Sequence, residues 1–289
     1  MKWSESVNRI TEKRSLSSAV LLMKVDAPDI AKRVKAGQFI ILRVDEKGER
    51  IPLTVADADP ATGEVTIMFQ VAGATTRQLS MKEEGDYLVD FVGPLGVPTH
   101  YEGATRACVV GGGVGCAIAY PQAKALHTMG IPVDVIAGFK TKDIVMLEDE
   151  FKAVCDIVYV TTDDGSYGIH GFVTNQLEAL INEGKGYDLV IAIGPIPMMK
   201  FVSKVTEKYG IKTIVSLNPV MIDGTGMCGG CRVTVGGETK FACVDGPDFD
   251  GHLVDYDGLM NRNSFNKAVE VEKDEHICRL GLNGGHCNG

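Results

Sequence analysis

The second half of the sequence alternates short apolar strands with helical segments, and this alternation limits the possible fold more than any other feature. A strand, a glycine-rich turn and a helix fill residues 106–130. Further strands are expected over 133–139, 155–165, 187–195 and 212–218, and further helices over 145–154, 172–184 and 197–210. Such alternation predicts a mostly parallel sheet covered by helices on both faces.

The first hundred residues have a different pattern. Runs rich in β-branched and aromatic residues lie over 18–25, 38–44, 64–73 and 87–94, separated by turns of Pro, Gly and Asp. No helical period connects them. Short strands at this spacing favour an antiparallel β-barrel.

The composition excludes several classes of protein. A chain of 289 residues is long enough for two or three compact units. A net charge of −9 without a Lys/Arg-rich run argues against binding to nucleic acid or to an anionic membrane surface. The start of the chain is polar, and no apolar run approaches about 18 residues, so we expect a cytoplasmic protein without a membrane span.

A glycine-rich turn, VVGGGVG, joins the first strand of the alternating region to its helix. Glycine lets the backbone turn sharply and approach a pyrophosphate, which binds at the positive end of the helix that follows. The strict GxGxxG spacing is met only loosely, and a plain tight turn is the alternative interpretation. The strand–turn–helix context favours a dinucleotide, with Gly111, Gly112, Gly113 and Gly115 as the candidate binding residues.

Two further loops follow predicted strands and should lie at the same edge of the sheet, where ligands of such sheets bind. Asp163 and Asp164 could accept hydrogen bonds from ribose hydroxyls, and their charge would repel a 2′-phosphate. This favours NAD(H) over NADP(H), although DDGS can also be a simple turn. The second loop supplies Gly194, Pro195 and Met198 as candidate nucleotide contacts.

A cysteine module follows the alternating region. Cys228 and Cys231 form a CxxC motif, and Cys243 lies further along the chain. Clustered thiols of this kind indicate a metal site in a reducing compartment. His252 could complete a Cys₃His zinc site. The plant-type [2Fe–2S] spacing C-x₄-C-x₂-C instead places Asp223 at the first ligand position, and the spacing alone leaves zinc and iron–sulfur equally open.

Taken together, the motifs resemble those of the ferredoxin–NADP⁺ reductase superfamily. The resemblance is carried, in order, by AGQFIILRV, RIPLTVAD, GATTRQL, VGPLG, GGGVGCAIAYP, TTDDGSYGIHG, GPIPMMKFV and the cysteine module, from about residue 36 to 247. Within the superfamily the chain is similar to the electron-transfer subunits of class B dihydroorotate dehydrogenases. It is more similar still to the small subunits of NADH-dependent reduced ferredoxin:NADP⁺ oxidoreductases.

The resemblance implies FAD in the barrel, where the superfamily has an Arg-x-aromatic-Ser/Thr signature. Here Ile51 stands at the arginine position, so Arg50, one residue earlier, is the candidate for the flavin phosphates. The other flavin-binding residues that the resemblance implies are Pro52, Leu53, Thr54, Phe69, Gln70, Gly73, Thr75 and Thr76.

The resemblance also implies a function. The chain would exchange hydride between NAD(H) and FAD and pass single electrons through a [2Fe–2S] cluster on Asp223, Cys228, Cys231 and Cys243. The acceptor would be a larger flavin/[4Fe–4S] subunit, paired with this chain in a heterodimer, that bifurcates electrons. An Asp at the first ligand position favours this family, because the dihydroorotate family resembles a four-cysteine type. No catalytic acid–base residue is predicted, since the cofactors carry the chemistry.

Four segments are expected: a FAD-binding barrel over 1–99, an NAD-binding domain over 100–219, a [2Fe–2S] module over 220–258 and a tail over 259–289. Two other functions stay open. The same machinery could serve dihydroorotate oxidation, or the chain could be a zinc-stapled nucleotide-binding protein without a redox role.

Overall fold

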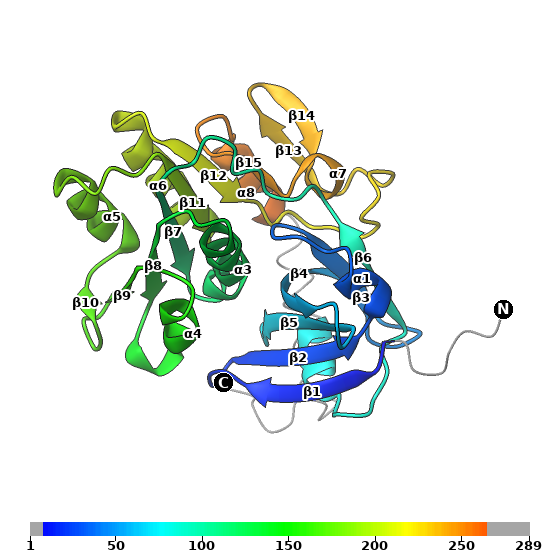
Figure 1. The fold of residues 1–289 in the computed structure, drawn as a ribbon. Coiled ribbons are helices and arrows are strands. Elements are labelled where there is room, and N and C mark those ends of the chain that lie inside the picture. The colour runs from blue at the N-terminus through cyan, green and yellow to red at the C-terminus, as the bar shows by residue number, and fades with distance from the viewer. Residues whose placement is uncertain (1–7, 265–289) are drawn as a thin grey trace.

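The computed structural model describes residues 8–264. A strand-rich part, a larger part with a sheet between helices, and a small hairpin module are all in contact (Figure 1). Most of the predicted tail, from residue 265 onward, lies outside the described residues. Within the part of the chain that the structure describes, no helix is both long and apolar enough to cross a bilayer.

The N-terminal part is an antiparallel sheet of six strands in the order β1-β2-β5-β4-β3-β6. Its strands are β1 (Ile10–Ser15), β2 (Val20–Asp26), β3 (Phe39–Arg43), β4 (Arg50–Asp59), β5 (Glu64–Gln70) and β6 (Asp90–Leu95). Two short helices, α1 (Pro28–Ala31) and α2 (Ala74–Ser80), lie between strands. The segment before β6 returns to β1 through an Arg9–Tyr87 bridge, so the sheet curls into the predicted barrel.

Strand β3 is buried on both of its sides, which explains why its sequence is continuously apolar. Ile40 and Leu42 face the barrel core, together with residues such as Ile67. Phe39 and Ile41 point the other way, toward the cysteine module. Strand β1 was not among the predicted strands, because its sequence ITEKRS is polar and most of its side chains lie at the surface.

The nucleotide part is a seven-stranded sheet in the order β10-β9-β8-β7-β11-β12-β15, parallel except for β15. Its strands are β7 (Ala107–Gly112), β8 (Val133–Phe139), β9 (Ile157–Thr162), β10 (Ile169–His170), β11 (Leu189–Ile193), β12 (Lys212–Ser216) and β15 (Asp248–Asp250). Its helices are α3 (Gly115–Thr128), α4 (Glu148–Lys152), α5 (Val173–Asn182) and α6 (Ile196–Lys208), with a 3₁₀ turn η1 (Lys142–Ile144). The predicted alternation is confirmed.

The helices divide between the two faces of this sheet (Figure 1). Helices α3 and α4 cover one face, and α5 and α6 cover the other. The α3 face also packs against the barrel, because Leu22 and Met68 share one apolar core with Leu126. At the edge of this contact Lys124 Nζ pairs with Asp57 of β4 at 2.7 Å. Helix α3 therefore joins the two large parts.

The cysteine module consists of the hairpin β13 (Arg232–Val235) and β14 (Glu238–Phe241), helix α7 (Ala242–Asp245), strand β15 and helix α8 (Tyr256–Ser264). Strand β15 returns to the large sheet and pairs with β12 in antiparallel register. The predicted boundary at residue 219/220 stays a prediction. Strand β15 follows this boundary in the sequence but pairs with β12, which precedes it.

A buried carboxylate ties together the amino ends of the central strands. Asp134, at the start of β8, is fully buried and accepts a 2.6 Å hydrogen bond from the Tyr187 hydroxyl. Arg106 and Lys185 lie 3.4 and 3.6 Å from the same oxygen, so two cations offset its charge. This cluster lies at the end of the strands opposite to the glycine turn.

Replacing Leu126 by Ala tests the shared core. The side chain of Leu126 is fully buried in this core. Its loss should lower the free energy of unfolding by about 2–5 kcal/mol, through lost transfer energy and the remaining cavity. Denaturant unfolding measures the change, and His127→Ala, at an exposed neighbour, should change it by less than about 0.5 kcal/mol. A loss from Leu126→Ala no larger than that of the control would contradict the shared core.

Candidate functional site

The glycine turn lies where β7 ends and α3 begins, directly against the loop after β11. A Cβ on Gly112 would collide with Met198 and lie 3.2 Å from Pro195, and a Cβ on Gly115 would collide with the carbonyl of Ile193. The structure thus brings two predicted nucleotide loops together. It also shows why these glycines are needed: protein packing leaves no room for a side chain.

Gly113 is different from its neighbours in the turn. It has a φ of +56°, and no atom lies within 4 Å of where its Cβ would be. Its amide donates to the carbonyl of Gly138, which holds the turn against β8. Helix α3 begins two residues later, and no side chain caps its start, where the helix dipole favours an anion. Gly113 is therefore the glycine that leaves space for a ligand.

The two aspartates of the next loop have different surroundings. Asp164 Oδ1 accepts hydrogen bonds from the Ser166 hydroxyl at 2.7 Å and the Ser166 amide at 3.0 Å, which hold the pKa of Asp164 below its usual value. Asp164 thus shapes the turn. The exposed Asp163 carboxylate makes no hydrogen bond or ion pair with another described residue, and it remains free to accept bonds from a ribose.

Strand β4 carries the predicted flavin residues. Arg50, Pro52, Leu53 and Thr54 are all half-buried on it. The Arg50 Nε is buried and has no hydrogen-bond partner. A buried guanidinium nitrogen without a partner is costly, and an anion such as a phosphate would satisfy it. This orphaned donor fits the predicted binding of flavin phosphates.

Several of the remaining flavin candidates are buried or already form hydrogen bonds within the protein. Phe69 is buried in the barrel core, and Gln70 is exposed at the end of β5. The Thr76 hydroxyl accepts hydrogen bonds from the amides of Ala72 and Gly73, both at 3.0 Å, and so closes the start of α2. The Thr75 hydroxyl is 3.5 Å from Glu49. Flavin binding by Gly73, Thr75 and Thr76 stays a prediction, and the Thr76 hydroxyl is already bonded to its own turn.

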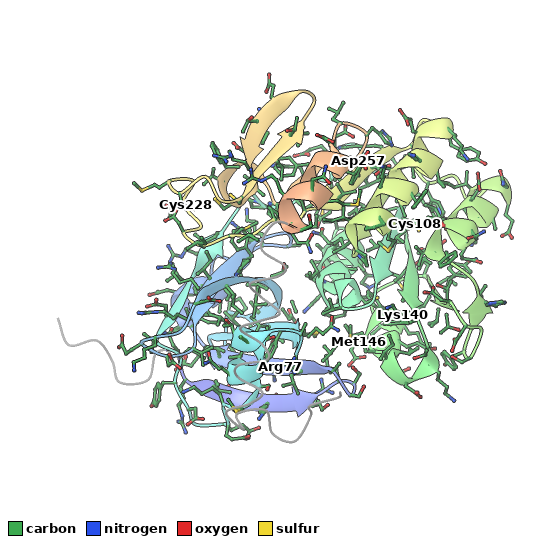
Figure 2. The ribbon with its side chains drawn as sticks, turned by 180° about the vertical axis from the view of Figure 1, so that it is seen from behind. Arg77, Cys108, Lys140, Met146, Cys228 and Asp257 are labelled. Atoms are coloured by element: carbon green, nitrogen blue, oxygen red, sulfur yellow. The ribbon has the colours of Figure 1, made fainter. Side chains whose placement is uncertain are left out.

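The cysteine module brings two of its three thiols together. The Sγ atoms of Cys231 and Cys243 are 3.2 Å apart and buried, too far apart for a disulfide and close enough to share one metal ion. Burial raises the pKa of the Cys243 thiol to about 12. Cys228 is exposed, in the loop on the side of the module away from the nucleotide part (Figure 2).

Asp223 holds the loop that leads to Cys228. Its Oδ2 accepts hydrogen bonds from the Thr225 hydroxyl at 2.7 Å, the Thr225 amide at 3.0 Å and the Met227 amide at 3.1 Å. These bonds lower the pKa of Asp223 and keep it ionised. A ligand role would therefore use its other oxygen or release these bonds. The donor set of one carboxylate and three thiols fits an iron–sulfur cluster chemically.

The zinc alternative does not gain a fourth ligand from His252. Its Nε2 lies 3.0 Å from the Thr206 hydroxyl on α6, and its Nδ1 faces Asp250. Among residues 8–264, no group of three or more His, Cys, Asp or Glu side chains stands close enough to hold a single metal ion. The four predicted ligands thus share one loop and one helix without forming a compact cage.

Strand β3 connects the cysteine pair with the predicted flavin strand β4. Cys231 and Cys243 pack in one apolar cluster with Phe39 and Ile41 of β3. On the sheet, Phe39 pairs with Thr54 and Ile41 pairs with Pro52. Because adjacent strands lie about 5 Å apart, the predicted flavin and cluster residues are near neighbours. Sequence reasoning did not identify Phe39 and Ile41, because their apolar character is the same as that of any core strand.

Comparison with known proteins identifies the same parts. A family model described as the iron–sulfur cluster binding domain of dihydroorotate dehydrogenase B matches residues 218–255. The chain is 47% identical to the dihydroorotate dehydrogenase B (NAD(+)) electron transfer subunit homolog of Thermotoga maritima, over 89% of this chain and 90% of that protein. It is 34% identical to the corresponding electron transfer subunit of Geobacillus thermodenitrificans, over 83% and 94% of the two chains.

Solved structures show the same similarity at the level of the fold. One chain from the structure of NADH-dependent reduced ferredoxin–NADP oxidoreductase, described in terms of flavin-based electron bifurcation, superimposes with a TM-score of 0.87. That chain is 44% identical, and the match covers 94% of this chain and 99% of that one. The cytochrome b5 reductase domain of Ulva prolifera nitrate reductase, at 18% identity, a TM-score of 0.57 and 70% and 92% coverage, shares the fold alone.

These relatives confirm the predicted fold and, at the level of the family, the predicted oxidoreductase subunit with FAD, NAD(H) and a [2Fe–2S] cluster. A barrel with an orphaned arginine donor, a glycine turn at the edge of a parallel sheet and a paired-thiol module lie in this order in the described chain. The chain belongs to the family of electron-transfer subunits of the dihydroorotate dehydrogenase B type, in the ferredoxin reductase fold.

Proposed function

We propose that this protein takes electrons from NADH, or returns them to NAD⁺, and exchanges them singly with a larger partner subunit that contains flavin and [4Fe–4S] clusters. The observation that carries the proposal is the position of β3, which pairs with the predicted flavin strand β4 and has the cysteine pair packed on the face formed by Phe39 and Ile41. When bound, the flavin exchanges hydride with the nicotinamide, and flavin and cluster exchange single electrons.

The protein's own residues would position these groups and exclude water. Arg50 would bind the flavin phosphates through its free Nε, and Thr54 and Leu53 would present a hydroxyl and an apolar face to the ring. The open space at Gly113 and the uncapped start of α3 would receive the pyrophosphate of NAD(H). Asp223, Cys228, Cys231 and Cys243 would hold the cluster.

A bifurcating ferredoxin:NADP⁺ oxidoreductase is the partner that we favour, because the first ligand position holds Asp223. The 44% identical chain from such an enzyme supports this choice. A dihydroorotate dehydrogenase is the second candidate, supported by the names of several relatives. Purification of the native complex separates the two, according to which large subunit accompanies this chain.

A visible spectrum under anaerobic conditions tests the cofactors and the ligand set together. The wild-type protein should show flavin bands over a broad iron–sulfur absorption, both bleached by NADH. A colourless protein that contains zinc would overturn the proposal.

Asp223→Ala should change the cluster spectrum and its paramagnetic signal while the flavin bands persist, and Asp223→Cys should restore a stable cluster. Glu238→Gln, which removes an exposed carboxylate from the same module, is the control and should change neither. An unchanged paramagnetic signal in Asp223→Ala would show that Asp223 is not a ligand.

The glycine turn gives a second test. Gly115→Ala forces a methyl group against the carbonyl of Ile193, which must displace either the turn or the loop after β11. NADH affinity should fall on the order of tenfold or more, since a small misplacement of a binding loop has a large effect. Titration of flavin bleaching with NADH measures this. Gly184→Ala, where a Cβ meets no atom within 4 Å but φ is +84°, is the control: it should lower the stability of a separate turn and leave NADH affinity unchanged.

The choice of nucleotide depends on Asp163. Wild-type protein should be reduced much more efficiently by NADH than by NADPH, because this free carboxylate would repel a 2′-phosphate. Asp163→Asn should narrow the ratio of kcat/KM values for the two nucleotides, mostly by improving NADPH. Equal reduction of the wild type by both would contradict the assignment.

A further inference from the structure

The carboxyl group of Asp248 is enclosed where the three parts of the protein meet. The residue begins β15 and is half-buried as a whole, but its Oδ1 is inaccessible to solvent and has no hydrogen-bond partner. Its Oδ2 accepts hydrogen bonds from the Thr99 hydroxyl and, at 3.2 Å, from Gln122 Nε2. Thr99 lies in the link between the barrel and the nucleotide part, and Gln122 lies on α3.

These side chains belong to a connected network. The Tyr101 hydroxyl donates to Gln122 Oε1, and Gln122 Nε2 also donates to Thr99 Oγ1 at 2.8 Å. Gly37, in the barrel loop before β3, has a φ of +88°. A Cβ there would collide with Thr99 Oγ1 and lie 2.9 Å from Asp248 Oδ2. The barrel, the link, α3 and β15 therefore all converge on one carboxyl group.

No cation balances this carboxyl among the described residues. Thr99, Gln122, Gly37 and Ser216, which lies across from it on β12, are uncharged. The titratable group that faces it through the network is the Tyr101 hydroxyl, whose pKa burial also raises. Burial raises the pKa of Asp248, because a buried carboxylate without a cation is poorly stabilised.

The Thr99 hydroxyl has one hydrogen and two acceptors within reach. One is Asp248 Oδ2, and the other is the carbonyl of Ala36 in the barrel, at 3.4 Å. When Asp248 is ionised, Thr99 donates to it. When Asp248 carries a proton, the acid donates to Thr99 Oγ1, and the Thr99 hydrogen is released to Ala36. One proton thus reverses the direction of the hydrogen bond between β15 and Thr99 and adds a hydrogen bond from Thr99 to the barrel.

We propose that Asp248 is a proton-dependent positioning residue that sets the cysteine module against the barrel and the nucleotide part through Thr99 and Gln122. The proton is exchanged with water, and no covalent bond between heavy atoms changes. The consequence for electron transfer rests on the proposed function. The proton-dependent contact itself does not rest on it. One measurement tests the contact, and a second tests its consequence for electron transfer.

The first measurement is thermal stability against pH. A raised pKa in the folded state means that the folded protein holds a proton that the unfolded chain has released. Stability from this group is therefore full below about pH 4 and is lost as the pH rises through the folded pKa. Asp248→Asn, which keeps the shape and cannot ionise, should match the wild type at about pH 3.5 and exceed its Tm by a few degrees at about pH 8.

Matched variants keep this result interpretable. Asp255→Asn removes a charge from an exposed side chain of the same module that forms no ion pair among the described residues, and it should follow the wild-type pH dependence. Thr99→Val removes the shared hydroxyl, and it should lower the Tm at every pH. A parallel pH dependence of Tm in wild type and Asp248→Asn would overturn the proposal.

The second measurement is rapid mixing with NADH, which follows flavin bleaching and the iron–sulfur absorption separately. Asp248→Ala should leave the KM for NADH unchanged and slow the later phase on the order of tenfold, because the module is no longer held in place. Asp248→Asn should restore that phase and make its rate independent of pH. A later phase equally fast in Asp248→Ala would overturn the positioning role, whereas a wild type that NADH does not bleach would overturn the proposed function and leave the stability result standing.

Discussion

The packing of β3 between two different neighbours is the contact on which the rest of the structure depends. Ile40 and Leu42 close the barrel core, while Phe39 and Ile41 form the surface on which Cys231 and Cys243 lie. A strand with both sides buried cannot shift its register by one residue without exchanging its two apolar faces. The distance between β4, which carries the predicted flavin residues, and the cysteine pair is therefore set by one strand, β3.

Helix α3 has a similar role for the nucleotide part. Its first turn forms part of the glycine loop, its middle contributes Gln122 to the buried network, and Lys124 and Leu126 contact the barrel or its shared core. The start of this helix is thus held in a fixed position relative to both β4 and β15. The carboxyl groups of Asp134 and Asp248 have opposite surroundings, since Asp134 has two nearby cations and Asp248 has none among residues 8–264.

The sequence predicted which loops meet at the candidate nucleotide site, but the physical reason for several of their residues differs from the predicted one. The glycine turn and the loop after β11 do meet, yet Gly112 and Gly115 are required by the packing of Met198 and Ile193, and Gly113 alone leaves open space. Of the two aspartates, Asp164 is used by its own turn. Local sequence cannot distinguish these cases, because a residue that binds a ligand and one that completes a turn have the same composition.

Periodicity by itself determined the alternating sheet and the barrel class, because these follow from local residue patterns. The spacing of the cysteines predicted a metal site, and its ligand set stays a prediction. The tertiary structure alone decided that the polar segment ITEKRS is a strand, that β15 returns to the large sheet, and that His252 faces α6. It also decided that Asp248 meets Thr99, 149 residues away in the sequence. Such contacts depend on the burial of distant segments against each other, and no local pattern records that burial.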